Sequence, residues 1–352
     1  MFSDSRGIRH RSNRPHGDLP TKNMFREMME EAERVASTLA RNTEVIGITL
    51  GGGLSRGYAD GLSEIDLNIY VEEEWLPKWN MGGGPMPQGD YLGDSFHMDV
   101  DFLSYEEEWK REWDLSKKWD ASYQRILHDP GGKIARLLDE KDIFTADEKH
   151  RLAFRGYLDC VYFGDIAVRQ WIIRGDPLVA NQMINSGILS LIKLLFLVND
   201  EYPPFDKWLM NYSYSLLWKP KDWRHRLESL AIIKEITLGE AERRRKEFMG
   251  LYHEIWGRIV GEEYKSIGLI ELETLEILNY IIENSPAVET FRSLYGEKPL
   301  SSEVLFKLAG IATVDGKRVI RFNKSRFMKA KENGFHEFLE WNRAILNRVE
   351  LR

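Results

Sequence analysis

A pair of glycines between two strand-like segments constrains the fold of this chain more than any other feature of its sequence. The apolar run 45–50 predicts a buried strand, and Gly52 and Gly53 follow it closely. Glycine has no Cβ, so the chain can turn sharply here and its amides can approach another group. Beyond the turn, residues 65–71 alternate between apolar and polar side chains, which is typical of a strand with one buried face. The sequence therefore predicts a strand, a tight turn and a second strand with a polar face.

Two carboxylates lie at the start of that polar face. Glu64 and Asp66 are two residues apart, and residues two apart on a strand point to the same side of the sheet. The two side chains can therefore share one cation. Backbone amides at a glycine turn can also cradle a phosphate group. A phosphate cradle that faces metal-binding carboxylates is the equipment of phosphoryl or nucleotidyl transfer.

A second pair of acids occupies a later strand-like segment. In residues 98–103, Asp99 and Asp101 alternate with apolar side chains, so both point to the same face. Exposed acids on an edge strand would give the same pattern. Their apolar neighbours nevertheless favour a site, because carboxylates in such surroundings are often functional. We interpret this strand as a further source of site carboxylates.

The glycine turn and its acids resemble the signature of a known superfamily. Gly52-Gly53, followed by the run Ser-Glu-Ile-Asp-Leu at 63–67, is similar to the motif of the nucleotidyltransferases related to DNA polymerase β. The resemblance is closer to the lincosamide, aminoglycoside and minimal nucleotidyltransferases. Their usual pattern has Ser where this chain has Gly53 and Asp where it has Glu64. The resemblance covers residues 45–71 strongly and the rest of the chain more thinly.

This resemblance implies a site of three carboxylates. In the related family, the third carboxylate precedes a polar residue and a helix, and residues 100–104 fit that pattern, which favours Asp101 and leaves Asp99 as the alternative. The implied catalytic and metal-binding residues are therefore Glu64, Asp66 and Asp101. They would hold two Mg²⁺ ions, for which Mn²⁺ could substitute. Asp101 would also serve as the general base.

The resemblance also implies contacts to the nucleotide. It assigns them to five residues: Gly52, Gly53, Ser55, Arg56 and Lys207. The glycine amides would hold phosphates, and the segment 199–209 resembles a loop and helix start of the antibiotic-modifying relatives. There Lys207 would contact a phosphate, whereas the ordinary alternative is a solvated lysine beside a packed Trp208.

The implied reaction is transfer of a nucleoside monophosphate, AMP from ATP by resemblance, to a hydroxyl of a small molecule or protein, with release of pyrophosphate. The expected partners are a nucleoside triphosphate and an acceptor that the sequence does not identify. One alternative is a nucleotide-binding protein with weak catalysis, since Glu64 departs from the usual pattern. The other alternative is an antitoxin-like protein that binds a partner.

The fold class predicted from these patterns is α+β. A small mixed-sheet nucleotidyltransferase domain is expected over 21–145, after a disordered tail at 1–20 that contains four arginines. A helical domain is expected over 146–285, and the resemblance implies that it closes over the substrate; a small helical and hairpin extension is expected over 286–352. Helical spacing is found in four segments of the helical domain: 147–174, 177–199, 206–217 and 239–260.

Two further segments have recognisable patterns. In the C-terminal extension, residues 311–322 predict a β-hairpin with an Asp-Gly turn, and a final helix is expected over 327–349. Between the two acidic strands, the glycines and prolines of residues 75–97 predict a long loop. A flexible connection is the ordinary interpretation of that loop. The alternative is a lid in which Trp75 or Trp79 stacks on a base.

Composition excludes several classes of protein. The formal net charge is −7, with no long basic block in the expected folded part, which argues against general nucleic-acid binding. No apolar run approaches the roughly 20 residues that a membrane span needs, so no membrane association is expected. A single cysteine, Cys160, excludes an intrachain disulfide and fits a reducing compartment. We therefore expect a cytoplasmic protein, and the sequence does not predict its oligomeric state.

Overall fold

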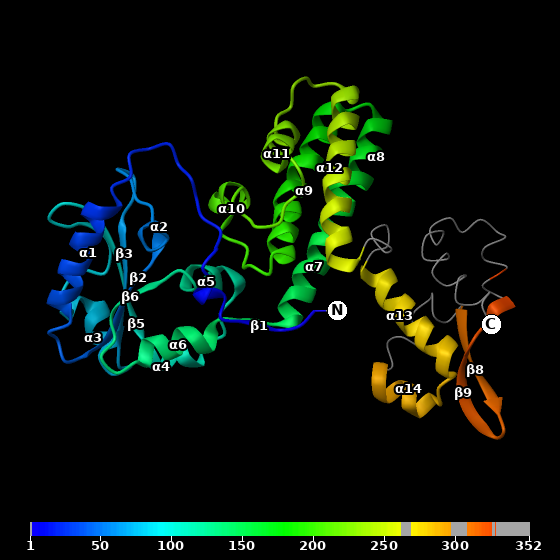
Figure 1. Cartoon of the computed structure of the whole chain (residues 1–352), viewed down its shortest axis with the longest axis horizontal. Coiled ribbons are helices and arrows are strands. Elements are labelled where there is room, and N and C mark those ends of the chain that lie inside the picture. Colours follow the sequence, from blue (N-terminus) through cyan, green and yellow to red (C-terminus); the bar gives the residue numbers. More distant parts are fainter. Residues whose placement is uncertain (1, 262–268, 297–307, 326–327, 329–352) are drawn as a thin grey trace. The chain divides into compact units, whose positions relative to one another are not determined.

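The structure is a computed structural model, and it describes residues 2–261, 269–296, 308–325 and 328 (Figure 1). The chain divides into two compact units, Met1–Met249 and Gly250–Arg352. The first unit contains the expected sheet domain and most of the expected helical domain. The final helix expected over 327–349 lies outside the described residues, apart from residue 328.

A five-stranded mixed sheet forms the centre of the first unit. Its strands are β2 (Val45–Leu50), β3 (Ile65–Val71), β4 (Gly89–Leu92), β5 (His97–Ser104) and β6 (Arg125–His128). The strand order is β4-β5-β3-β2-β6, in which β3 and β5 are parallel and the other neighbours are antiparallel. With the helices described below, this sheet confirms the predicted α+β fold.

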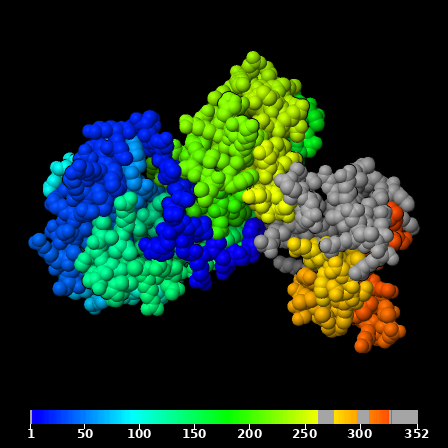
Figure 2. Space-filling view, in the orientation of Figure 1, coloured from blue at the N-terminus to red at the C-terminus, as the bar shows by residue number. Residues whose placement is uncertain are grey.

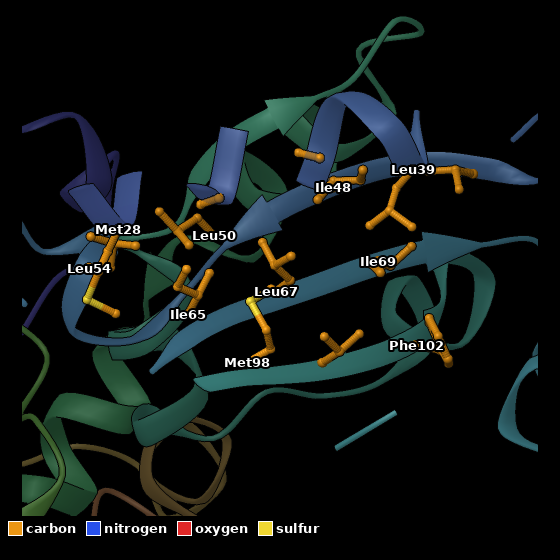
Figure 3. Close-up of a cluster of buried hydrophobic side chains, with 14 of the residues drawn as sticks. Met28, Leu39, Ile48, Leu50, Leu54, Ile65, Leu67, Ile69, Met98 and Phe102 are labelled. Carbon is orange, nitrogen blue, oxygen red and sulfur yellow. The ribbon is translucent and has the colours of Figure 1, made fainter. Parts of the chain in front are cut away.

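One face of the sheet is covered by helix α1 (Phe25–Leu39) (Figure 3). Met28, Ala32, Ala36 and Leu39 recur at helical spacing and are buried against the strands. Ile65, Leu67 and Ile69 supply the facing side chains of β3. Burying a large apolar side chain stabilises a fold by roughly 1.5–3 kcal/mol, so this layer fixes which face of β3 points away from the site.

The opposite face of β3 is covered along only part of its length. Tyr70 packs in a second apolar cluster with Ile134 and Leu137 of α6, and Asn68 is also buried. Asp66 lies on the same face, nearer the start of the strand, and is half-buried. The polar face is therefore open where the acids lie. The helices near this face are α4 (Tyr105–Lys110), α5 (Leu115–Ala121) and α6 (Lys133–Lys141).

The segment expected to be a long loop, 75–97, contains regular structure. It forms α3 (Leu76–Lys78), the π-helical turn η2 (Trp79–Gly83) and strand β4. The ring of Trp79 is 3% exposed and packs edge-on against Phe102, with 5.1 Å between the ring centroids. The apolar core therefore holds Trp79, so the alternative in which Trp79 stacks on a base is wrong.

The N-terminal segment also differs from its prediction. Strand β1 (Ser5–Arg6) pairs with β7 (Ile143–Phe144), the short helix η1 (Ile8–His10) follows, and Ile8 is fully buried. The prediction of a disordered tail at 1–20 is therefore wrong for residues 2–20. The physical reason is that three arginines of this segment, Arg9, Arg11 and Arg14, have carboxylate partners far away in the sequence.

The rest of the first unit is helical. A capping box at Thr145 and Glu148 starts α7, and α9 is apolar and buried over most of its length. Helix α9 is also long and apolar enough to cross a membrane. This is weak evidence for a membrane span, because 56% of its most apolar window is buried inside the molecule. The elements are α7 (Ala146–Val161), η3 (Tyr162–Ile166), α8 (Ala167–Arg174), α9 (Pro177–Val198), α10 (Asp206–Ser213), α11 (Trp223–Ala231) and α12 (Leu238–Val260), which continues into the second unit.

The second unit contains the predicted hairpin. Strands β8 (Ala309–Val314) and β9 (Lys317–Phe322) are antiparallel and joined at Asp315-Gly316, both of which have positive φ. The unit also contains α13 (Leu269–Asn284) and α14 (Val288–Tyr295). Ile320 of the hairpin and Phe291 of α14 share a small apolar core.

Candidate metal and nucleotide site

Three carboxylates come together at the open end of the polar face. The ligand oxygens of Glu64, Asp66 and Asp99 all lie within 4.8 Å of one another. The parallel register of β3 and β5 places Asp66 directly beside Asp99. Glu64 lies two residues before Asp66 and therefore on the same side. We call these three residues the acid group.

The register decides which aspartate of β5 joins the acid group. Asp101 lies beside Asn68, one pleat further along the sheet, and its side chain is exposed. The structure therefore brings Asp99 into the group, the alternative to Asp101 in the sequence analysis. Asp101 still lines the same pocket as Asp66 and Asp99.

The acid group is electrostatically crowded. Burial raises the pKa of Asp66 to about 7, with further increases from Glu64, Asp120 and Asp99, while Arg56 lowers it. The pKa of Asp99 is also raised, first by burial and then by Asp101. Carboxylates held this close repel one another unless a cation lies between them. Carboxylate oxygens are the donors that Mg²⁺ and Mn²⁺ prefer, so the donor set fits a divalent cation.

The glycine turn lies directly against Asp66. Gly52 has a φ of +60°, and a Cβ at this position would come within 1.7 Å of Asp66 Oδ2. The amide of Gly51 donates a hydrogen bond of 2.8 Å to the backbone oxygen of Asp66. The turn begins the short helix α2 (Gly52–Ser55). Residue 52 must therefore be glycine for the turn to lie against the carboxylate.

A pocket of about 420 Å³ opens beside the acid group. Its floor is the glycine turn and the polar face of β3 and β5. One wall, called here the α5 wall, consists of Asp114, Ser116, Lys117 and Asp120. The other, called the α10 wall, consists of Phe205, Lys207 and Trp208. The remaining lining residues are Gly51, Gly52, Arg56, Asp66, Leu67, Asn68, Asp99 and Asp101.

Only some of the residues predicted to bind the nucleotide line the pocket. Gly52, Arg56 and Lys207 line the pocket, whereas Gly53 and Ser55 do not. Ser55 is buried, and its hydroxyl donates a hydrogen bond of 2.9 Å to the carbonyl oxygen of Gly52. Its side chain therefore holds the shape of the turn.

Arg56 is buried between aromatic rings. Its side chain is 6% exposed, and its guanidinium carbon lies 4.6 Å from the ring centroid of Trp119 and 5.8 Å from that of Trp208. Nη1 donates a hydrogen bond of 2.9 Å to Oδ1 of Asp120. Cation–π contact and this ion pair together fix the position of Asp120 at the edge of the pocket.

Two charged groups of the pocket were not predicted from the sequence: the carboxylate of Asp120 and the ammonium of Lys117. The side chain of Asp114 accepts a hydrogen bond from the backbone amide of Lys117 and caps the start of α5. Asp114, Lys117 and Asp120 are three residues apart and therefore lie along one side of this short helix. That spacing was a signal within the charged run 111–120. On its own it is equally typical of a solvated helix face, and the pocket gives it a role.

One protein-family model matches a part of the chain that includes one wall of the pocket. Residues 122–209 match a domain of unknown function (DUF4037), and this match includes the α10 wall but none of the acid group. No curated protein matches the chain significantly. The solved structure of a nucleotidyltransferase-like protein from Exiguobacterium sibiricum is similar at 14% identity, with a TM-score of 0.39 over 84% of this chain and 99% of that one. That TM-score is too low to support an argument about activity.

Proposed function

We propose that this protein is a metal-dependent nucleotidyltransferase, which transfers AMP from ATP to a hydroxyl of a small molecule or protein and releases pyrophosphate. The observation that carries the proposal is the acid group, held against a glycine turn at the floor of a pocket with basic and aromatic side chains. Phosphoryl-transfer sites need this combination of metal ligands, close backbone approach and positive charge.

Glu64, Asp66 and Asp99 would hold the metal, which we propose to be Mg²⁺, with Mn²⁺ as a substitute and a second ion arriving with the triphosphate. A bound divalent cation supplies charge neutralisation to the phosphate oxygens and to the attacking hydroxyl. Asp66 has the central place in this set, because it is paired with Asp99 in the sheet, lies two residues after Glu64 and contacts the glycine turn at Gly52. Glu64 is exposed and reaches the group from the rim.

The basic side chains of the two walls would bind the triphosphate. Lys117 lies on the α5 wall and Lys207 on the α10 wall, so a triphosphate between them would meet an ammonium group on each side. Gly51 and Gly52 leave room for phosphate oxygens to approach the backbone at the floor. Phe205 and Trp208 would supply aromatic surface to the base.

Asp101 would act as the general base. It is exposed, lines the pocket and lies outside the acid group, so its carboxylate is available to a proton. An oxygen of Asp101 would accept the proton of the acceptor hydroxyl as that hydroxyl oxygen bonds to the α-phosphorus of ATP. The bond between the α-phosphorus and its bridging oxygen would break, and pyrophosphate would leave with the bonding electrons.

Release of pyrophosphate from ATP in the presence of Mg²⁺ tests this proposal, measured against a panel of hydroxyl-bearing acceptors. Wild type is expected to release pyrophosphate and to add AMP to an acceptor, which mass spectrometry identifies, whereas Asp66→Asn is expected to do neither. Asp94→Asn is the matched control, because Asp94 is an exposed aspartate outside the pocket.

The outcomes separate the proposal from its alternatives. Equal release by wild type and Asp66→Asn would mean that the acid group is not the catalytic site. Binding of ATP without release, for every acceptor in the panel, would favour a nucleotide-binding protein with weak catalysis. An AMP adduct found on a co-purified protein would identify the acceptor as a protein partner.

A further inference from the structure

The two walls of the pocket come from distant parts of the chain. Helix α5, which carries the α5 wall, ends at its C-cap Ser122, two residues after Asp120. The α10 wall begins at Phe205, directly after the loop 199–204, which contains Glu201. A ligand that contacts Lys117 on one wall and Lys207 on the other therefore depends on how far apart these two segments are held.

One guanidinium joins the two segments. Arg14 Nη1 donates hydrogen bonds to the backbone oxygen and the hydroxyl oxygen of Ser122, at 3.0 and 2.9 Å. Its Nε and Nη2 donate to Glu201 Oε2, at 3.2 and 3.0 Å. The planar fork of an arginine can make both sets of bonds at once, which fixes their geometry. Arg14 thus bridges the two segments that adjoin the walls.

The bridge is buried and well supported. The side chains of Arg14 and Glu201 are 8% and 6% exposed. The Arg14 guanidinium carbon lies 3.9 Å from the ring centroid of Tyr123, whose hydroxyl donates a hydrogen bond of 2.6 Å to Pro15 O. Burial raises the pKa of Glu201, and Arg14 opposes that increase. The bridge therefore rests on the pairing of two buried charges, which is sensitive to loss of either partner.

The rest of the N-terminal segment holds Arg14 in place. Arg11 donates hydrogen bonds of 2.7 Å to the backbone and side-chain oxygens of Asp200, which precedes Glu201. On the other side of Arg14, His16 exchanges two hydrogen bonds with the hydroxyl of Ser215. Figure 2 shows this segment in dark blue, running between the cyan-green surface of the sheet part and the green helices.

We propose that Arg14 is a positioning residue of the nucleotidyl-transfer site, and that the N-terminal segment 5–17 completes the pocket by setting the separation of its α5 and α10 walls. This inference rests on the proposed function. The hydrogen bonds of the Arg14 guanidinium go to Ser122 and Glu201, and Asp66 and Asp99 of the acid group lie on β3 and β5. Loss of the bridge is therefore expected to weaken binding of the triphosphate while leaving binding of the metal alone unchanged.

The choice of variant must avoid an unpaired buried charge. Arg14→Met alone would leave Glu201 charged and buried, which destabilises a fold. The double variant Arg14→Met/Glu201→Gln removes both charges and the bridge while keeping the volume of both side chains. Arg14→Lys keeps a charge beside Glu201 but cannot fork to Ser122. Arg9→Met is the matched control, because Arg9 lies in the same segment and pairs with Asp139 of α6.

Three measurements test the positioning role. The first two are affinities: Mn²⁺ alone, by electron paramagnetic resonance, and ATP with Mg²⁺, by calorimetry. The third is amide hydrogen exchange of residues 115–123 and 199–213 in the nucleotide-free protein. For the double variant we expect unchanged Mn²⁺ affinity, ATP affinity lower by about 10-fold, and faster exchange in both segments, since a small displacement of positioning groups has large effects. Arg14→Lys should fall between wild type and the double variant, and Arg9→Met should match wild type.

Each outcome has a definite meaning. Unchanged exchange in both segments would overturn the inference, whether or not ATP binds. Faster exchange with unchanged ATP affinity would also overturn it, because the separation of the walls would then not matter to the ligand. A parallel loss of Mn²⁺ affinity and thermal stability would show a structural role instead. If wild type releases no pyrophosphate but the exchange and ATP results hold, the proposed function fails and the positioning role of Arg14 for the pocket stands.

Discussion

Two regions of this protein, the acid group and the surroundings of Arg244, hold charge in opposite ways. In the acid group, three carboxylates lie within 4.8 Å of one another, and burial with mutual repulsion raises the pKa of Asp66 to about 7. In the helical part, Arg244 of α12 is fully buried, yet its guanidinium donates to neutral oxygens of Asn181, Asn185 and Leu230. The acid group therefore has an excess of negative charge, whereas Arg244 is a single positive charge whose guanidinium is hydrogen-bonded.

This difference shows that a functional site and a stable fold place different requirements on buried charge. Burying a charge destabilises a fold only modestly when the charge is well hydrogen-bonded. Removing that charge then leaves its buried partners without a hydrogen bond, which is destabilising. Crowded carboxylates reduce the stability of the metal-free protein, and a bound cation reverses that effect. The acid group should therefore be expendable for folding and essential for activity, and Arg244 should be the reverse.

Asp66→Asn gives the largest expected effect. Activity is expected to fall on the order of 1,000-fold, because the central ligand of the acid group is lost. The free energy of unfolding without divalent metal should stay unchanged or rise by about 1 kcal/mol, since one of the repelling charges is removed. Pyrophosphate release and urea unfolding in EDTA measure the two effects. A loss of metal-free stability would break the comparison with Arg244.

Arg244→Met should show the opposite pattern. The substitution leaves the oxygens of Asn181 and Leu230 buried without their donor, so we expect unfolding to become easier by about 3 kcal/mol. Activity per folded molecule should stay near that of wild type. Lys246→Met is the control, because Lys246 lies on the same helix with its side chain 71% exposed, and its effect should stay within about 0.5 kcal/mol.

Gly52→Ala sharpens the comparison by combining backbone strain with a disturbed site. The new Cβ would collide with Asp66 Oδ2, so Mn²⁺ affinity is expected to fall by about 10-fold or more. The left-handed φ adds about 1–2 kcal/mol of destabilisation. Gly57→Ala separates the two terms, since Gly57 has a φ of +94° with open space around its Cβ position. If both variants weaken Mn²⁺ binding equally, the contact with Asp66 is not what matters.

Local sequence pattern was sufficient for strands β2, β3 and β5 and for their acids, but not for β4 or β6. The alternation in 65–71 predicted β3, because burial of one face against α1 requires apolar residues at every second position. The choice between Asp99 and Asp101 could not be made in this way. It depends on the register of β5 against β3, which is a pairing between distant segments that a local pattern does not fix.

The same reason explains what was missed at the pocket. The arginine-rich start looks like a disordered tail because the partner of Arg14 is Glu201, far along the chain. Likewise, Asp120 is one acid among many in a charged helix until Arg56 is found beside it. Residues whose role depends on a distant partner are visible only after the fold has brought the partner close.

The smallest predicted effect is a pH dependence of stability in the helical part. Hydrogen bonds from Arg243 lower the pKa of Glu240 from 4.5 to about 2, and the amide of Lys234 contributes. A lowered pKa means that the charged form is stabilised by folding. The contribution is therefore present above about pH 4.5 and is lost as the pH falls towards 2.

Glu240→Gln tests this contribution and closes the comparison. It should lower the free energy of unfolding by about 1–2 kcal/mol at neutral pH, and the difference from wild type should vanish near pH 2. Urea unfolding across this pH range measures both. Paired charge in α12 would then stabilise the fold only while it is ionised, whereas Asp66 in the metal-free acid group opposes folding when ionised. A difference that persists unchanged at pH 2 would mean that Glu240 stabilises the protein through packing and not through its charge.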